Sequence, residues 1–391
     1  MAIPLKVNLR SLLVRRTSTL LTLAGIGLVV MVFVIMTSLA AGLTSTFRST
    51  GDRRNLIVLR AAATSELESY ISRQATAIIT TLPEVERGED GQPLAVAEAF
   101  LVINQPRRDD PTRSANVILR GVSQASFTLR PEVRITEGRL FRPGVDEVIA
   151  SRGMAHRFVG CGLGERLSLR GRVFEVVGLF DGARTAWDSE VWGDVTVLSD
   201  VYRRRGYSSS TLRCSDPFAQ ARLIRRLADD RRLNLKALNQ ADHFEQQTES
   251  AAMLKTLAVI LTVVLSVGAC FSVANSMYAA VSSRTREIGT LRALGFPRWG
   301  ILVAFVVESL VLSLIAGAAG VAMGGIVLTL FTGTMGTSNW RTFAEVAFSF
   351  RLTPGIAAAG LALSAATGVI GGFLPARLAA RMPITQALHE A

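Results

Sequence analysis

The stretch SSRTREIGTLRALGFPR, residues 282–298, is a short basic segment between two long apolar runs. Its apolar side chains share one helical face and its charged side chains fall largely off that face. The apolar set is Ile288, Leu291 and Leu294, and the charged set is Arg284, Arg286, Glu287 and Arg292. Gly295 and Pro297 form a helix-stop signal, because glycine adopts the left-handed cap conformation and proline cannot continue a helix. Two interpretations stay open: a helix that a cytoplasmic partner binds, or a loop whose arginines only set topology.

The apolar runs predict four transmembrane helices. Residues 20–43, 257–281, 301–330 and 356–374 contain 24, 25, 30 and 19 residues, with Glu308 as the one charge among them. At 1.5 Å rise per residue each run extends about 28 Å or more, enough to cross a hydrocarbon core roughly 30 Å thick. We expect an integral membrane α-helical protein with a large α+β extracytoplasmic domain between the first and second spans.

The position of the charges explains the net charge of +12. Residues 44–250 hold 30 of the 43 basic and 27 of the 31 acidic residues, which leaves 13 basic and 4 acidic residues elsewhere. Ten of these 13 lie at the N-terminus, in residues 284–298 and in the C-terminal tail, and four spans place all three segments on one side. This is the positive-inside pattern, so we expect a multi-pass membrane protein with both termini and residues 284–298 cytoplasmic, and we do not expect nucleic-acid binding.

The predicted organisation follows this topology. A cytoplasmic amphipathic segment occupies residues 1–19, the four spans occupy 20–43, 251–281, 300–331 and 354–374, and a cytoplasmic helix occupies 282–299. Outside lie an α/β plus β-rich domain at 44–250 and a loop at 332–353, and a cytoplasmic tail covers 375–391. In the outer domain we expect strands at 55–60, 116–122, 167–169, 173–179 and 195–198, helices at 66–81 and 217–230, and mostly loop at 84–111.

The sequence lacks the motifs of common catalytic sites. It has no G-x-x-x-x-G-K-[ST] phosphate loop and no G-x-S-x-G nucleophile elbow. Its histidines, His156, His243 and His389, are far apart and have no Cys or carboxylate at ligand spacing. We predict no catalytic residue, no metal site and no enzymatic activity in this chain.

Glu308, the acid inside the third apolar run, lies about 12 Å into that helix from Gly300. Because desolvation of an intramembrane carboxylate is costly, it needs a partner, and a structural hydrogen bond or a transport role both remain open. The pairs Gly320 with Gly324 and Gly368 with Gly372 put small residues one turn apart, which favours close helix packing within or between subunits.

The cysteines suggest one candidate disulfide. Cys161 and Cys214 both lie in the predicted outer domain, and a disulfide between them and two free thiols are alternatives that spacing does not decide. Cys270 lies in the second span and is expected to pack as a small apolar residue.

Three stretches carry a family resemblance. They are Asn8-Leu9-Arg10 with Arg15-Arg16 and Leu20-Leu21-Thr22-x-x-Gly25-Ile26, the segment from Arg284 to Gly295, and Pro375-Ala376-Arg377 through Pro383 to Ala387-Leu388. Together they resemble the MacB-type, or FtsX-like, family of ABC transporter permeases, which includes the lipoprotein-releasing LolC and LolE proteins. The order of one span, a large outer domain and three spans is also similar. Most of residues 44–250 is recognised only by position and pattern.

The resemblance implies a permease that works with a pair of ABC ATPase subunits and a second permease copy, with a homodimer expected. ATP and magnesium would bind the ATPase, which is expected on a separate chain. The resemblance makes residues 284–295 the coupling helix that the ATPase would push. A membrane-fusion adaptor and an outer-membrane channel are further candidate partners, besides the lipid bilayer.

Three outputs remain open for such a permease. The first is mechanotransmission for export or extrusion of a substrate. The second is an FtsX-like signalling device that activates a periplasmic partner such as a cell-wall hydrolase, and the third is LolC/LolE-like lipoprotein release. The two apparent parts of the outer domain favour export.

Overall fold

The structure is a computed structural model that describes residues 16–330, 336–338, 345–347 and 350–383. The chain divides into two compact units. The helical unit comprises residues 1–41, 252–331 and 350–391, and the α/β unit comprises residues 42–251 and 332–349.

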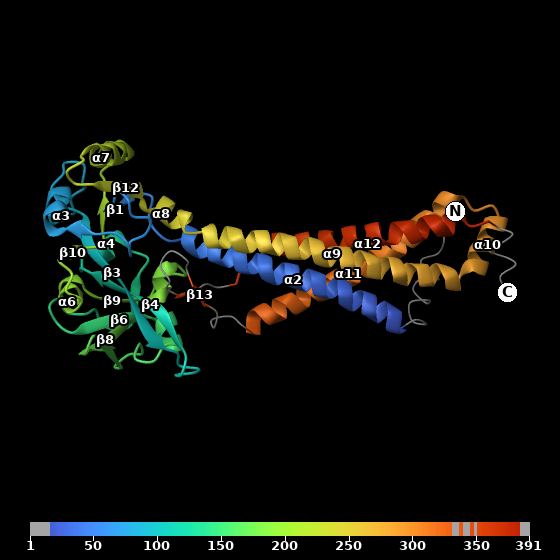
Figure 1. Cartoon of the computed structure of the whole chain (residues 1–391), viewed down its shortest axis with the longest axis horizontal. Coiled ribbons are helices and arrows are strands. Elements are labelled where there is room, and N and C mark those ends of the chain that lie inside the picture. The colour runs from blue at the N-terminus through green and yellow to red at the C-terminus, as the bar shows by residue number, and fades with distance from the viewer. Residues whose placement is uncertain (1–15, 331–335, 339–344, 348–349, 384–391) are drawn as a thin grey trace. The chain divides into compact units, whose positions relative to one another are not determined.

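Long apolar helices make up the helical unit (Figure 1). They are α2 (Arg16–Arg48), α9 (Glu249–Ser283), α11 (Arg298–Leu330) and α12 (Pro354–Arg381), and the short α10 (Thr285–Ala293) joins α9 to α11. Within the described residues, α2, α9, α11 and α12 are the helices long and apolar enough to cross a membrane. The prediction of four membrane-spanning helices is therefore confirmed.

Local sequence explains where α12 begins and how far it extends. Thr353 caps the helix, since its side chain accepts a hydrogen bond from the backbone N–H of Ile356, and Pro354 occupies the first turn, where no N–H is needed. The helix then continues through Pro375 to Arg381. Arg377 and Arg381 therefore lie on a regular helix one turn apart.

Small residues let α2 approach α11 closely. A Cβ atom added at Gly320 would lie 2.5 Å from the carbonyl oxygen of Gly27, and one added at Gly324 would lie 3.1 Å from Cγ1 of Val34. At Gly320 a side chain would require movement of the α2 backbone, whereas at Gly324 the side chain of Val34 would have to shift. The first small-residue pair therefore packs within the chain.

The second pair serves the contact of α12 with α11. A Cβ atom at Gly368 would lie 2.0 Å from Oγ of Ser313, and one at Gly372 would lie 2.1 Å from Oγ of Ser309. Both serine hydroxyls donate to carbonyl oxygens of their own helix, so no polar hydrogen faces the glycines. The two helices thus meet along a surface of serine and glycine.

The α/β unit is built on one ten-stranded sheet (Figure 1). Its order is β12 (Leu235–Asn239), β1 (Asn55–Arg60), β11 (Ser209–Arg213), β3 (Ala95–Pro106), β4 (Ser114–Val122), β9 (Glu190–Asp194), β6 (Glu147–Ser151), β8 (Arg172–Asp181) and β5 (Arg134–Gly138), with β7 (Arg166–Leu169) also paired to β8. The pairs β4 with β9 and β6 with β8 are parallel, and the other pairs are antiparallel. Two small ribbons pair β2 (Ile71–Ser72) with β10 (Gly206–Tyr207) and β13 (Gly336–Ser338) with β14 (Glu345–Ala347).

Two apolar clusters divide this sheet. One packs α3 (Arg73–Thr80) and α7 (Pro217–Asp229) on β1, β11 and β12, which come from both ends of the region. The other packs α5 (Arg152–Arg157) and α6 (Val195–Val201) on strands from β3 to β9. The helices α4 (Ser126–Leu129), α8 (Gln240–Gln246) and the 3-10 turn η1 (Ala186–Ser189) complete the unit. Two parts were predicted, and β3 joins them into one sheet.

Some predicted elements are wrong at the level of local structure. The helix predicted at 66–81 begins only at Arg73, because the side chain of Ser72 caps it by accepting from Ala75 N at 3.1 Å. The strand predicted at 195–198 is α6, whose N–H groups at Thr196 and Val197 donate to the Asp194 carboxylate. The region predicted as loop at 84–111 contains β3, which pairs with β4 on one side and β11 on the other.

Candidate functional site

The basic segment between α9 and α11 forms the helix α10, as its pattern predicts. It ends in a Schellman motif: Gly295 has φ +89°, its N–H donates to Arg292 O at 3.1 Å, and the Phe296 N–H donates to Leu291 O at 3.1 Å. Glycine adopts this left-handed conformation without steric penalty, so Gly295 fixes the end of the helix. Pro297 follows and starts the turn into α11.

The apolar side chains of this segment do not share one environment. Ile288 is 3% exposed and packs in the core of the helical unit, and Leu291 is half-buried. Leu294 is 73% exposed, contrary to the predicted common face. The helix ends at Ala293, so Leu294 belongs to the cap and no longer follows the helical spacing.

The charged side chains divide in the same way. Arg286 and Glu287 are exposed, whereas Arg292 is half-buried and its Nε is buried without a hydrogen-bond partner among the described atoms. Arg284 precedes α10 as its N-cap residue, and its side chain is only 12% exposed. The outward surface of α10 therefore offers one cation, one anion and an exposed leucine.

Arg284 supplies the partner of the acid in α11. Its Nη1 lies 3.5 Å from Oε2 of Glu308, and the Glu308 side chain is 4% exposed. This ion pair connects the start of α10 to α11 across the turn at Gly295. The sequence pattern singled out Arg284 and Glu308 separately, but it did not predict that they form an ion pair.

The α/β unit contains a buried charge cluster that the sequence did not reveal. Arg120 in β4 bonds to Glu66, Glu98 and Glu190 at 2.8 to 3.0 Å, and Arg130 pairs with Glu98 at 2.5 Å. All five side chains are at most 4% exposed. Arg120 and Arg130 also lie over the ring of Trp187, 5.0 and 4.5 Å from its centroid. The only sequence signal was a charged residue inside an apolar strand.

The cluster perturbs the acids in opposite directions. Burial acts to raise the pKa of Glu66, but the Arg120 charge and hydrogen bond outweigh it and lower that pKa to about 2. For Glu190 burial dominates and its pKa is raised despite Arg120. Burial acts to lower the Arg120 pKa, but Glu190 and Glu66 raise it well above its usual value. Arg120 therefore stays ionised among these acids.

A second buried ion-pair site involves the segment that connects α11 and α12. Glu345 in β14 accepts from Arg107 and from Arg157, the latter at 2.9 Å. The side chains of Arg157 and Glu345 are 7% and 5% exposed. This acid fixes β14 within the α/β unit.

The structure does not bring Cys161 and Cys214 together. Both thiols are free and buried, in separate apolar clusters, and burial raises the pKa of each to about 12. Cys270 is also free and its thiol lies 3.7 Å from the carbonyl oxygen of Thr367. Over the described residues, no group of three His, Cys, Asp or Glu side chains is placed to hold a metal ion.

Family models match both units of the chain. The model of the MacB-like periplasmic core domain matches residues 19–230, and the model of the FtsX-like permease C-terminal region matches residues 259–384. The second match contains α10, Glu308 and both small-residue pairs.

Relatives with assigned names align with nearly the whole chain. The macrolide export ATP-binding/permease protein MacB of Hyphomonas neptunium is 28% identical over 98% of this chain and 60% of its own length. The pyoverdine export ATP-binding/permease protein PvdT of Pseudomonas entomophila is 28% identical over 97% of this chain and 58% of its own length. The chain thus spans about three fifths of the length of these two relatives.

Two solved structures are similar to about half of this chain. The periplasmic region of MacB from Actinobacillus actinomycetemcomitans has 14% identity and a TM-score of 0.36, over 50% of this chain and 92% of that one. The extracellular domain of the noncanonic ABC-type transporter YknZ from Gram-positive bacteria has 16% identity and a TM-score of 0.36, over 47% of this chain and 100% of that one.

Proposed function

The chain belongs to the family of MacB-like and FtsX-like ABC transporter permeases, and we propose that it relays ATP-driven motion to its α/β unit for substrate export. The family match is consistent with the membrane subunit of such a transporter. The driving ATPase lies outside these 391 residues, which contain no phosphate-binding loop.

The anchoring of α10 supports this proposal more than any other observation. On its inner side, Ile288 is buried in the helical core and Arg284 pairs with Glu308 in α11. On its outer side, Arg286, Glu287 and Leu294 are exposed. A helix that is fixed to the membrane spans and open on the other side transmits a push to those spans, because packed interiors move as rigid elements.

The proposed orientation places α10, the N-terminus and the C-terminus in the cytoplasm, where the basic segments lie by the positive-inside pattern. The α/β unit then lies on the outer side of the inner membrane. ATP and magnesium act on the ATPase pair, and this chain contributes movement rather than chemistry.

We propose a second permease copy as the partner within the membrane, forming a homodimer. The helical unit exposes large apolar side chains along α9, which a second copy or lipid would cover. They are Leu257, Ile260, Val263, Val264, Val267 and Phe271. An adaptor and an outer-membrane channel are proposed as partners of the α/β unit.

Export is favoured over hydrolase activation and lipoprotein release. The names of the two long-aligning relatives describe export, of macrolides in one and pyoverdine in the other.

The coupling role is tested with the outward side chains of α10. The double variant Arg286→Ala/Glu287→Ala in the full chain should lose most co-purification with the ATPase and most permease-dependent ATP hydrolysis, because it removes two exposed charges and leaves the buried face intact. The matched control is Arg152→Ala/Glu137→Ala, an exposed ion pair of the α/β unit with a distance of 3.0 Å. Unchanged assembly and hydrolysis in the α10 variant would overturn the coupling role.

A further inference from the structure

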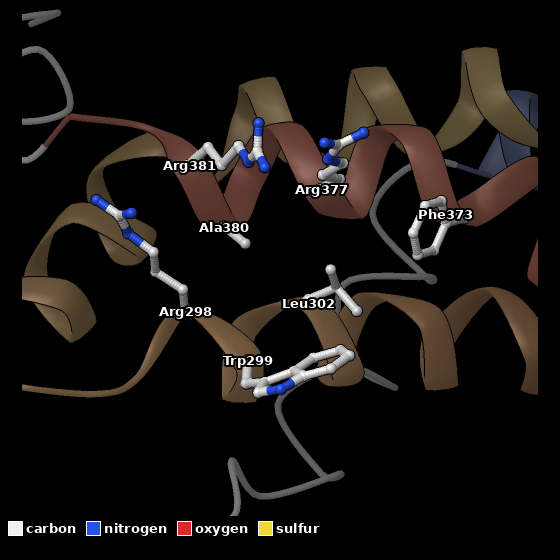
Figure 2. Close-up of a pocket in the computed structure, with 7 residues that line it drawn as sticks. All are labelled: Arg298, Trp299, Leu302, Phe373, Arg377, Ala380 and Arg381. Atoms are coloured by element: carbon white, nitrogen blue, oxygen red, sulfur yellow. The ribbon is translucent and has the colours of Figure 1, made fainter.

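A cavity of about 340 Å³ opens between the start of α11 and the end of α12 (Figure 2). Its lining comes from two short segments far apart in the sequence. From α11 come Arg298, Trp299 and Leu302, and from α12 come Phe373, Arg377, Ala380 and Arg381. None of these residues belongs to the anchored helix α10.

The charge of this cavity has one sign. Three of its lining residues are arginines, and none is acidic. Arg298, Arg377 and Arg381 are all exposed, and no ion pair joins them to another residue of the described ranges. Arg298 is also the first residue of the 33-residue helix α11, whose N-terminal dipole favours an anion. The cavity therefore selects for negative charge.

The remaining lining is apolar. Figure 2 shows Leu302 of α11 and Ala380 of α12 pointing into the space between the helices, with Phe373 further along α12. Arg377 and Arg381 lie across α12, and Arg298 lies at the start of α11. Trp299 and Phe373 are 71% and 43% exposed, and aromatic side chains of this exposure are typical of the membrane interface. A small hydrated anion would gain nothing from these surfaces.

We propose that this cavity binds an anionic phospholipid of the inner leaflet. Its phosphate pairs with the arginines, and its glycerol and upper acyl chain pack on Leu302 and Phe373. Basic pockets between spans at the cytoplasmic face suit such head groups, because each arginine near the surface adds electrostatic affinity and the apolar wall accepts the chain. Because α11 also carries Glu308, the partner of Arg284, lipid occupancy would act on the same helix that α10 is fixed to.

The inference rests on the proposed orientation of the spans and does not depend on coupling to an ATPase. It is tested by native mass spectrometry of the full chain in detergent, without ATP or ATPase. Phosphatidylglycerol and phosphatidylcholine with identical acyl chains are added in turn. The wild type should bind phosphatidylglycerol at least ten-fold more tightly than phosphatidylcholine.

Substitutions assign this preference to the cavity. Arg298→Gln/Arg377→Gln/Arg381→Gln should lose about five-fold in phosphatidylglycerol affinity for each arginine and bind both lipids alike. The matched control Arg286→Gln removes an exposed arginine of α10 and should keep the preference. A variant with lysine at positions 298, 377 and 381 should keep part of the preference for phosphatidylglycerol, since the positive charge remains. Phe373→Ser should weaken the binding of both lipids, because it removes the apolar wall of the cavity.

Other occupants give distinct results. Glycerol phosphate or inorganic phosphate that displaces the lipid at equal concentration would identify a site for a soluble anion and overturn the proposal. A loss of phosphatidylglycerol affinity in Arg286→Gln equal to the loss per cavity arginine would show unspecific attraction to basic charge. This result would also overturn the proposal. So would loss of ATPase co-purification in the triple glutamine variant with lipid affinity unchanged, since the cavity would then be a protein-docking site. Failure of ATPase coupling alone, with lipid selectivity intact, would count only against the proposed function.

Discussion

Arg284 Nη1 lies 3.5 Å from Glu308 Oε2, so the residue that starts α10 is paired with a carboxylate inside α11. Both side chains are largely buried. The pair joins the two helices on either side of the Gly295 turn. It gives the intramembrane acid a partner within its own chain, as the cost of burying a lone carboxylate requires.

This pair should behave as one unit in mutagenesis. Arg284→Gln and Glu308→Gln should each lower the thermal stability of the full chain, because each leaves its partner without an opposite charge. In the double variant the two losses should not add, with a coupling free energy of about 0.5–3 kcal/mol. Unfolding of the purified protein in detergent measures the four states. Strict additivity would show that the two groups do not interact.

The pattern of the sequence was sufficient for the membrane part of the fold. Long apolar runs with basic flanks predict spans, because a lipid-facing helix must be apolar over the thickness of the bilayer. The Gly295 and Pro297 signal likewise predicted the end of α10, since the left-handed cap depends on local geometry alone.

The buried charges of the α/β unit were beyond such reasoning. Arg120 and Glu66 are 54 positions apart and meet only because the sheet brings β4 beside the loop before β2. Their spacing carries no signal, and the charge of Arg120 inside an apolar strand does not identify its partners. The strand β3 was missed for a related reason, since a region rich in Gly, Pro and charge encloses it. For Leu294 the prediction was wrong for the opposite reason. The apolar helical face was assumed to continue to Leu294, but the helix ends at Ala293.

The cluster around Arg120 should dominate the stability of the α/β unit. Arg120→Met removes the cation that holds Glu66, Glu98 and Glu190, and it should cost about 3–5 kcal/mol, because three buried carboxylates lose their shared partner. Arg152→Met is the matched control at an exposed pair and should cost less than about 1 kcal/mol. Denaturant unfolding followed by tryptophan fluorescence reports both, since Trp187 lies against Arg120. Similar losses in the two variants would contradict the role of burial.

The loss of folding stability at acidic pH should depend on Glu147. Hydrogen bonds from Arg139 and Arg142 lower its pKa from 4.5 to about 2, although burial acts in the opposite direction. A lowered pKa stabilises the folded state above pH 4.5, and that stability is lost as the pH falls from 4.5 toward 2. The shift corresponds to about 3 kcal/mol, which screening at the half-exposed arginines reduces to about 1–2 kcal/mol.

Comparison with Glu147→Gln isolates this contribution. The difference in unfolding free energy between wild type and variant should be constant above pH 5 and should shrink between pH 4.5 and 2. Chemical unfolding at a series of pH values measures it. A difference that does not change across this window would show that Glu147 titrates alike in the folded and unfolded states.

Glu345 should hold the β13–β14 ribbon to the α/β unit. In Glu345→Gln the amide cannot neutralise Arg107 and Arg157, and Arg157 stays almost fully buried, so the variant should be destabilised by about 2–4 kcal/mol. Amide hydrogen exchange at residues 345–347 should increase by at least ten-fold. Glu137→Gln, at an exposed pair, serves as control and should leave this exchange unchanged. Undisturbed exchange in Glu345→Gln would mean that the backbone pairing alone fixes the ribbon.

Two glycines in the spans offer a matched test of helix packing. A Cβ at Gly320 would lie 2.5 Å from the carbonyl oxygen of Gly27, while a Cβ at Gly268 in α9 meets no atom within 4 Å. Gly320→Ala should therefore push α11 away from α2 and cost about 1–3 kcal/mol, the usual effect of overpacking. Gly268→Ala should be neutral or slightly stabilising, because alanine has the higher helix propensity. Thermal unfolding in one detergent compares the two, and because both changes add the same methyl group to a span, only packing against α2 separates them. Equal melting temperatures would place α2 and α11 further apart than the structure has them.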